Sequence, residues 1–109
     1  MPDAKKGDPR QALRLLDQVL SAISHPSRRQ ILLVLRFRGG MMTAGEIASR
    51  FSCAWPTTTR HLQVLKEAGL VRVEKRGRER YYNLESARLL SITRGWLRWF
   101  ESPHCEPNK

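Results

Sequence analysis

Apolar residues recur every three or four positions in two stretches near the ends of the chain, a spacing that predicts amphipathic helices. The first pattern begins at Pro9 and places aliphatic residues on one face: Leu13, Leu16, Leu20 and Ile23. The second runs from about Ser86 to Phe100 and places aliphatic and aromatic residues on one face: Leu89, Ile92, Trp96 and Trp99. Both helices therefore present a strongly apolar side.

Three shorter helices are predicted between these two. His25-Pro26 interrupts the first helix, and Pro26 suits the first turn of the second because that position needs no N–H partner. Gly39-Gly40 ends the second helix. Thr43-Ala44-Gly45-Glu46 fits a capping box, in which threonine and glutamate satisfy each other's backbone N–H groups at the start of a short third helix.

A tight turn at Ser52-Cys53-Ala54 leads into a fourth helix, which runs from Pro56 to about Ala68. Gly69 follows and suits the left-handed conformation that commonly ends a helix. The inward face of this helix carries residues spaced four and three apart: Thr58, Leu62 and Leu65. The opposite face carries mostly polar residues: Trp55, Thr57, Thr59, Arg60, Gln63 and Lys66.

This polar face has the chemistry that reads DNA in the major groove. Hydroxyl groups bond bases or phosphates, arginine binds guanine through two hydrogen bonds, and glutamine binds adenine in the same way. The free N–H groups of the helix N-terminus suit a phosphate. The alternative is an ordinary solvated face, but the consecutive threonines Thr57 to Thr59 are poor helix formers, so helix propensity does not account for them.

Two strands, Leu70-Val71-Arg72-Val73 and Arg80-Tyr81-Tyr82-Asn83-Leu84, are predicted to form a hairpin with Gly77 in its turn. This segment carries five basic residues against two glutamates: Arg72, Lys75, Arg76, Arg78 and Arg80. Side chains at such a tip reach phosphates or the minor groove, and Arg76 and Arg78 are the foremost candidates. The alternative is a charged edge that protects an exposed strand from aggregation.

A capped helix, a tight turn, a helix with base-reading groups and a basic hairpin are the outline of a winged helix-turn-helix. The sequence therefore predicts a mainly α fold of five helices with a small β-hairpin wing. This DNA-binding domain is expected to span residues 9–101, between a flexible N-terminal arm at 1–8 and a flexible tail at 102–109.

Length and charge agree with a DNA-binding domain. The 109 residues suit one domain, and 20 Lys+Arg against 10 Asp+Glu give a formal charge of +10, typical of a nucleic-acid or anionic-membrane partner. No apolar run reaches the roughly 18 residues of a membrane span, and the N-terminus lacks the apolar core of a secretory signal. Cys53 and Cys105 make no disulfide framework, so we expect a cytoplasmic protein.

Three segments make the chain similar to the ArsR/SmtB family of bacterial winged-helix repressors: HPSRRQILLVL, TAGEIASRFSCAWPTTTRHLQVLKEAGLV and RGRERYY. The similarity covers roughly residues 13–84. The central motif, in which E-I-A is followed by P-T-x-x-x-H-L-x-V-L-x-x-A-G-L-V, is highly specific to that family. The resemblance implies a homodimer formed by the first and last helices, and operator binding that blocks transcription.

Several residues depart from the family pattern. Trp55, Thr59 and Arg60 occupy positions where the family commonly has Gln, Ser and His in contact with DNA. Trp55 and Arg60 depart from those residue types, so the base preference of the family does not carry over. Ala54 stands where a capping serine is common, and an alanine there forfeits about 1 kcal/mol of helix capping. Cys53 stands where an apolar core residue, often Leu, is usual.

Many family members release DNA when a metal binds, but the residues for such a site are missing. The third helix, GEIASRF, contains no thiol or imidazole, and the last, SARLLSITRGWLRWF, contains no ligand, although these metals require such groups. We read His104-Cys105 as part of a loose tail and Cys53 as a small buried hydrophobe, with a redox role as the alternative. We therefore expect no metal and no cofactor, as in members with the opening His25-Pro26-Ser27-Arg28-Arg29-Gln30-Ile31-Leu32.

The apolar faces of the terminal helices predict a homodimer, because so much apolar surface usually marks an interface. The candidate interface residues are Leu13, Leu16, Leu20, Leu89, Ile92, Trp96 and Trp99. Two alternatives stay open. Part of each helix completes the core of the monomer, or an apolar ligand binds between Trp96, Trp99 and the first helix.

The function predicted from all of this is a metal-independent homodimeric repressor that binds double-stranded DNA at a pseudo-palindromic operator. The alternative is a repressor of the same kind that is released by metal, thiol oxidation or a small apolar molecule. A protein-interaction module is a further rival, which the basic charge disfavours. No paired carboxylates, nucleophile triad or glycine-rich phosphate loop supports an enzyme. The sequence names no inducer.

Overall fold

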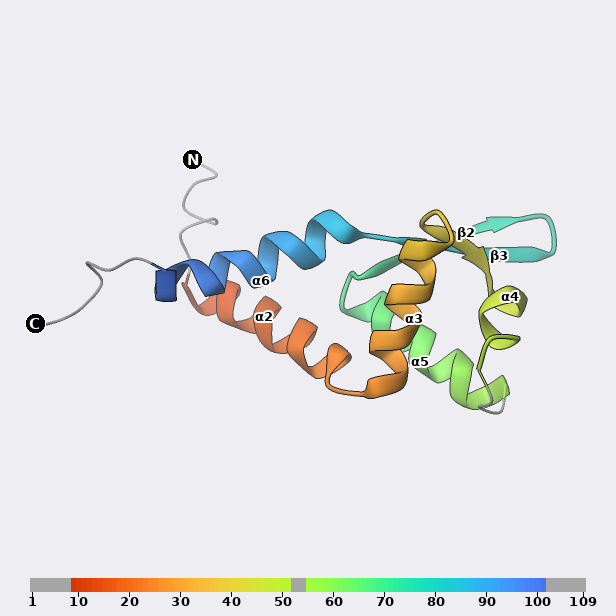
Figure 1. Cartoon of the computed structure of the whole chain (residues 1–109), viewed down its shortest axis with the longest axis horizontal. Coiled ribbons are helices and arrows are strands. Elements are labelled where there is room, and N and C mark those ends of the chain that lie inside the picture. Colours follow the sequence, from red (N-terminus) through yellow and green to blue (C-terminus); the bar gives the residue numbers. More distant parts are fainter. Residues whose placement is uncertain (1–8, 52–54, 102–109) are drawn as a thin grey trace, which may run out of the picture.

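The computed structural model describes residues 9–51 and 55–101 (Figure 1). In chain order these residues form α2 (Pro9–Ile23), α3 (Pro26–Phe37), β1 (Met41–Thr43), α4 (Ala44–Ala48), α5 (Trp55–Glu67), β2 (Val71–Arg76), β3 (Glu79–Leu84) and α6 (Ser86–Glu101). The expected helices and the hairpin are all present. None of the helices in the described part of the chain is long and apolar enough to cross a membrane.

The sheet has one strand more than the sequence predicts. Its order is β1-β3-β2, with both pairs antiparallel, so Tyr82 of β3 lies between Met42 and Val73. The predicted hairpin is β2 and β3, and Gly77 in its turn has a φ of 62°. The sequence reading missed β1 because a strand of three residues is too short to show alternation.

The predicted starts of two helices, α3 and α4, are confirmed. The side chain of His25 accepts a hydrogen bond from the backbone N–H of Ser27 and caps α3. At α4, Glu46 N–H donates to Thr43 Oγ1 at 3.1 Å, and Thr43 N–H donates to Glu46 Oε1 at 2.9 Å. This reciprocal pair is the predicted capping box, and it fixes where the chain leaves β1 and turns into α4.

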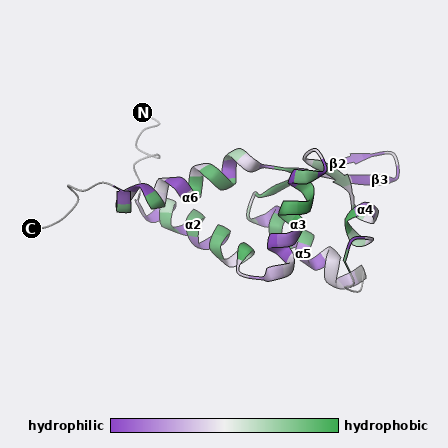
Figure 2. Ribbon diagram, viewed as in Figure 1, coloured by the Kyte–Doolittle hydropathy of each residue, from purple (hydrophilic) through white to green (hydrophobic). Residues whose placement is uncertain are grey.

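The molecule is elongated, with principal extents of 55 × 31 × 23 Å. In Figure 1, α2 and α6 lie side by side at one end, and the tip of the β2–β3 hairpin projects at the other. The hairpin is mostly hydrophilic in Figure 2. The core lies between these ends and is built mainly by α3, α5 and the sheet: Val19, Ala22, Ile31, Leu32, Leu35, Met42, Ile47, Leu62, Leu65, Ala68, Leu70, Val71 and Tyr82.

The apolar residues of the terminal helices divide into two sets. Leu16, a candidate interface residue, is only 5% exposed in the single chain, so it has little surface left for a partner. Leu89 and Ile92 are half-buried and pack against the core. The exposed set includes Leu13, Leu20, Leu90, Trp96, Leu97, Trp99 and Phe100. Part of each helix therefore completes the core of the monomer, and the outer part remains uncovered.

Gly69 ends α5 in the left-handed conformation that the sequence predicts, with a φ of 77°. Leu70 N–H donates to the Leu65 carbonyl at 3.0 Å, and Gly69 N–H donates to the Lys66 carbonyl at 2.9 Å, which is the Schellman arrangement. Arg88 of α6 completes this end, because its Nε donates to the Ala68 carbonyl at 3.2 Å. A Cβ on Gly69 would overlap the Arg88 side chain.

We expect Gly69→Ala to destabilise the protein by roughly 1–2 kcal/mol, since alanine is strained in the left-handed region and Arg88 must also move. Gly45→Ala is the matched control, because Gly45 lies in α4 with no atom within 4 Å of an added Cβ. That change should be neutral or stabilising by up to about 1 kcal/mol. Urea unfolding of the variants measures both effects, and equal stability of the two would contradict this account of the helix end.

Candidate nucleic-acid interface

The structure orients α5 as the sequence predicts. Thr58 is 2% exposed, and Leu62 and Leu65 are also buried, so these three residues anchor the helix to the core. The candidate DNA-binding residues point the other way and are exposed: Thr57, Thr59, Arg60, Gln63 and Lys66. Trp55 begins α5, but its side chain lies outside the described residues, as does the predicted turn at 52–54.

The basic residues of the wing differ in whether their side chains are paired with a carboxylate. Arg76 Nε donates to Glu74 Oε2 at 3.1 Å, and its guanidinium lies 4.9 Å from the centre of the Tyr81 ring. Through this contact the Arg76 guanidinium holds the pKa of the Glu74 carboxyl below its ordinary value. Arg72 Nη1 is similarly bound to Glu85 Oε2, at 2.7 Å. The side chains of Arg72 and Arg76, both in β2, are therefore paired with carboxylates.

Arg78 and Arg80 are exposed, and neither side chain makes a hydrogen bond or ion pair with any residue that the structure describes. Arg78 immediately follows Gly77 in the turn, and Arg80 lies near the start of β3. The sequence reading gave Arg76 and Arg78 equal weight. The geometry separates them, because only Arg76 is tied to a carboxylate and an aromatic ring.

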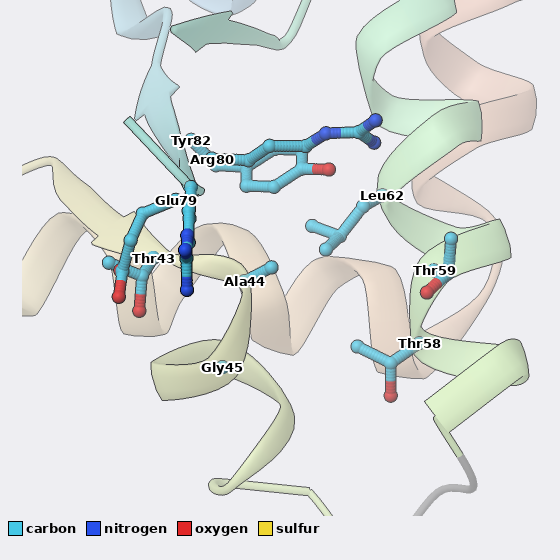
Figure 3. Close-up of a pocket in the computed structure, with 10 residues that line it drawn as sticks. Thr43, Ala44, Gly45, Thr58, Thr59, Leu62, Glu79, Arg80 and Tyr82 are labelled. Atoms are coloured by element: carbon cyan, nitrogen blue, oxygen red, sulfur yellow. The ribbon is translucent and has the colours of Figure 1, made fainter. Parts of the chain in front are cut away.

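A pocket of about 420 Å³ lies between α5 and the wing, next to the start of α4. Figure 3 shows Thr58, Thr59 and Leu62 of α5 on one side, and Thr43, Ala44 and Gly45 with the wing residue Glu79 on the other. Arg78, Arg80 and Tyr82 complete its lining. The hydroxyl of Thr58 is buried beside this pocket and has no hydrogen-bond partner among residues 9–51 and 55–101. The helix and the wing therefore flank one hollow that is rimmed by unpaired arginines.

Comparison with known proteins agrees with this arrangement. A helix-turn-helix domain family matches residues 23–74. The transcriptional repressor SdpR of Bacillus subtilis is 40% identical over 82 residues, which are 75% of this chain and 88% of SdpR. Among solved structures, an ArsR-like transcriptional regulator from Rhodococcus superposes with a TM-score of 0.72 at 30% identity, covering 82% of each chain.

The chain belongs to the ArsR family. It is a winged helix-turn-helix transcriptional regulator that binds DNA, as the sequence predicts. A solution structure described as the homodimeric winged helix-turn-helix DNA-binding domain of a possible ArsR-family regulator from Mycobacterium bovis also superposes. Its TM-score is 0.65 at 26% identity, and the match covers 94% of this chain and 96% of that one.

This ArsR-family regulator holds one of its candidate base-reading groups in an internal contact that the sequence reading did not foresee. Gln63 Nε2 donates to Glu67 Oε2 at 2.9 Å, one helical turn further along α5. The amide must leave this carboxylate before it can bind adenine through two hydrogen bonds. The side chains of Arg60 and Lys66, by contrast, make no hydrogen bond or ion pair with the described residues.

Two histidines meet in this regulator, although they are far apart in the sequence. The rings of His25 and His61 lie 4.4 Å apart between centroids, and Arg28 contacts His61. Sequence spacing gave no sign of this pairing. Within residues 9–51 and 55–101, no group of three or more His, Cys, Asp or Glu residues could hold a metal ion. Cys53, His104 and Cys105 lie outside the described residues.

Proposed function

We propose that this protein is a homodimeric, metal-independent repressor that places α5 of each protomer in successive major grooves of a pseudo-palindromic operator. The observation that carries the proposal is the orientation of α5. Buried Thr58, Leu62 and Leu65 fix the rotation of the helix about its own axis. That rotation directs Thr57, Thr59, Arg60, Gln63 and Lys66 outward as one face, which has the size and chemistry that a recognition helix needs.

The pocket between α5 and the wing supports the same docking. A helix in the major groove and a wing beside it must straddle the sugar-phosphate backbone that separates the two grooves. The hollow between Thr59 and Arg78 lies where that backbone would pass. Unpaired Arg78 and Arg80 on its wing side have the charge to neutralise phosphates there, so we assign them to backbone contacts and Arg60 to base contacts.

Arg60→Ala tests the assignment of the reading helix. Loss of a two-pronged guanine contact should weaken operator binding by about 1–3 kcal/mol and relax base preference at one position of each half-site. Operator selection from random DNA, followed by affinity measurements on the selected duplex, gives both quantities. Equal affinity and equal base preference in the variant and the wild type would remove Arg60 from the reading face. Leu33→Ala, at an exposed α3 position, should leave both quantities unchanged.

Arg78→Ala tests the role of the wing. Because a phosphate contact carries no sequence information, binding to operator and to random DNA should weaken by a similar factor, and the slope of log affinity against log salt should fall by about 1. Arg14→Ala removes the same charge from an exposed position of α2, at the other end of the molecule, and controls for net charge. If both variants lowered the salt slope equally, a specific phosphate contact at Arg78 would be refuted.

The exposed apolar residues of α2 and α6 support the homodimer. Leu13, Leu20, Trp96 and Trp99 remain exposed after the monomer core is complete, and Trp99 is 69% exposed. The rings of Trp96 and Phe100 pack edge to face, with 5.1 Å between their centroids, and form an aromatic surface. A contiguous apolar patch of this kind usually marks an interface, and the related domain from Mycobacterium bovis is described as homodimeric. Pairing of two such patches would also supply the two-fold symmetry that a pseudo-palindrome requires.

We therefore expect Trp99→Glu to shift the protein from dimer to monomer, because a charge at the centre of an apolar interface cannot be desolvated cheaply. Sedimentation equilibrium measures the change, and operator affinity should fall with it. Leu33→Glu is the control, because Leu33 is also a large apolar residue, 55% exposed, but lies on α3 outside the proposed interface. A variant that stays dimeric with glutamate at position 99 would place the interface elsewhere.

A further inference from the structure

The side chain of Arg28 joins three elements. It lies in the first turn of α3, and its Nε donates to the Ala22 carbonyl at the end of α2, at 2.7 Å. Its Nη2 reaches the Ser21 carbonyl at 3.5 Å, and its Nη1 lies 3.2 Å from Nδ1 of His61 in α5. One guanidinium therefore connects the end of α2, the start of α3 and the middle of the helix to which we assign DNA reading.

The end of α2 explains why arginines gather here. α2 has no basic residue in its own last turn, so its final carbonyl groups need donors from elsewhere. Arg29 also serves them, since its Nη1 donates to the Ile23 carbonyl at 2.8 Å and to the Ser24 carbonyl at 3.2 Å. The two arginines thus share the task of capping α2. Of the two, only Arg28 contacts α5 among the described residues, which makes Arg29 its natural control.

The chemistry of the Arg28–His61 contact fixes the state of the histidine. A guanidinium only donates hydrogen bonds, so Nδ1 of His61 must accept, and the ring must be neutral with its proton on Nε2. The ring is 6% exposed and lies against that of His25, whose own Nδ1 accepts from Ser27 N–H at 3.2 Å. A guanidinium at this distance also makes the two imidazoles a poor site for a metal cation.

We propose that Arg28 and His61 form a joint that positions α5 against the end of α2 for DNA reading, and that the joint holds only while His61 is neutral. The proposal rests on the assignment of α5 as the reading helix. Arg60, to which we assign a base contact, directly precedes His61 in the chain. A displacement of His61 from Arg28 would therefore carry the reading face with it.

The surroundings of His61 all disfavour its protonation. Burial is the largest cause that lowers the pKa of His61 below its ordinary value, and the charges of His25 and Arg28 lower the pKa further. These two are the titratable or charged groups that the structure places against the ring: His25 from the N-cap of α3, and Arg28 from its first turn. At neutral pH the joint is therefore intact, whereas acid turns Nδ1 into a second donor facing a donor.

The sign of the pH effect follows from this lowered pKa. Below the ordinary pKa of about 6.5, the unfolded chain binds a proton at this histidine while the folded chain resists it. Folding stability should therefore fall as the pH decreases from that value towards the lowered folded-state pKa, and level off below it. Operator affinity should fall over the same range, although added positive charge alone would favour binding to DNA.

The test compares variants of the full chain on an operator duplex selected by the wild-type protein at pH 7.5. Between pH 7.5 and 5.5, we expect wild-type affinity for this duplex to fall by about tenfold relative to its affinity for random DNA. His61→Asn retains an acceptor near the position of Nδ1 but does not titrate, so it should bind well at pH 7.5 and lose this pH dependence. His104→Asn, in the tail, controls for removal of a histidine and should behave as the wild type does.

A second arm uses the free protein. Arg28→Met and His61→Leu should each destabilise the fold, and the double variant should lose less stability than the sum of the two, because the variants remove the same contact. Arg29→Met with His61→Leu should be additive. The joint is overturned if the Arg28 and His61 effects are additive, or if acid strengthens operator binding in the wild type as much as it does for random DNA. A protein that selects no operator at pH 7.5 would contradict the proposed function alone, since the stability arm still tests the joint.

Discussion

The burial of one face of α5 is the constraint on which the rest of the structure depends. Leu62 and Leu65 reach the centre of a core built by α3 and the sheet, and Thr58 is buried beside the pocket. Because side chains three and four residues apart share a helical face, burying this set forces Thr59 and Arg60 into solvent. The same residues therefore stabilise the fold and orient the face that we propose reads DNA, so a loosened core would also misdirect the helix.

The rotation of α5 is fixed by its packing, and its position along the molecule is fixed by polar contacts. At its C-terminal end, the Ala68 carbonyl accepts from Arg88 of α6, and the Glu67 carbonyl accepts from Gln18 of α2 at 3.4 Å. Its middle is held by Arg28 through His61. These contacts lead to the two helices that we assign to the dimer interface. In the homodimer that we propose, short, direct contacts therefore connect α5 to the interface helices.

The sequence was sufficient for features that depend on a few neighbouring residues. The capping box at Thr43, the left-handed Gly69 and the hairpin turn at Gly77 were all predicted, because each is a local conformational requirement. The three residues of β1 were missed, since they become a strand only by pairing with β3, about forty residues further along the chain. The burial of Leu16 within the monomer was missed for a related reason, because helical periodicity identifies an apolar face without showing which part of it the monomer covers.

The sequence carried the least information about which side chains of the site are paired with one another. The sequence shows that Glu74 and Arg76 are both in the wing, but only the structure shows that they are bound to each other while Arg78 is not. The meeting of His25 with His61 depends on how three helices pack, which no spacing rule reports.

This distinction between paired and unpaired charge changes how the basic character of the chain should be understood. The net charge of +10 attracts DNA over a distance set by salt and is shared by the whole molecule. To bind DNA in one defined position, a protein needs charged side chains that have no internal partner. These side chains must also belong to rigid elements and line the same pocket. Arg72 and Arg76 contribute to the attraction, but their side chains are paired with carboxylates. Arg78 and Arg80 line the pocket beside α5, so they can also determine where the DNA backbone lies against the reading helix.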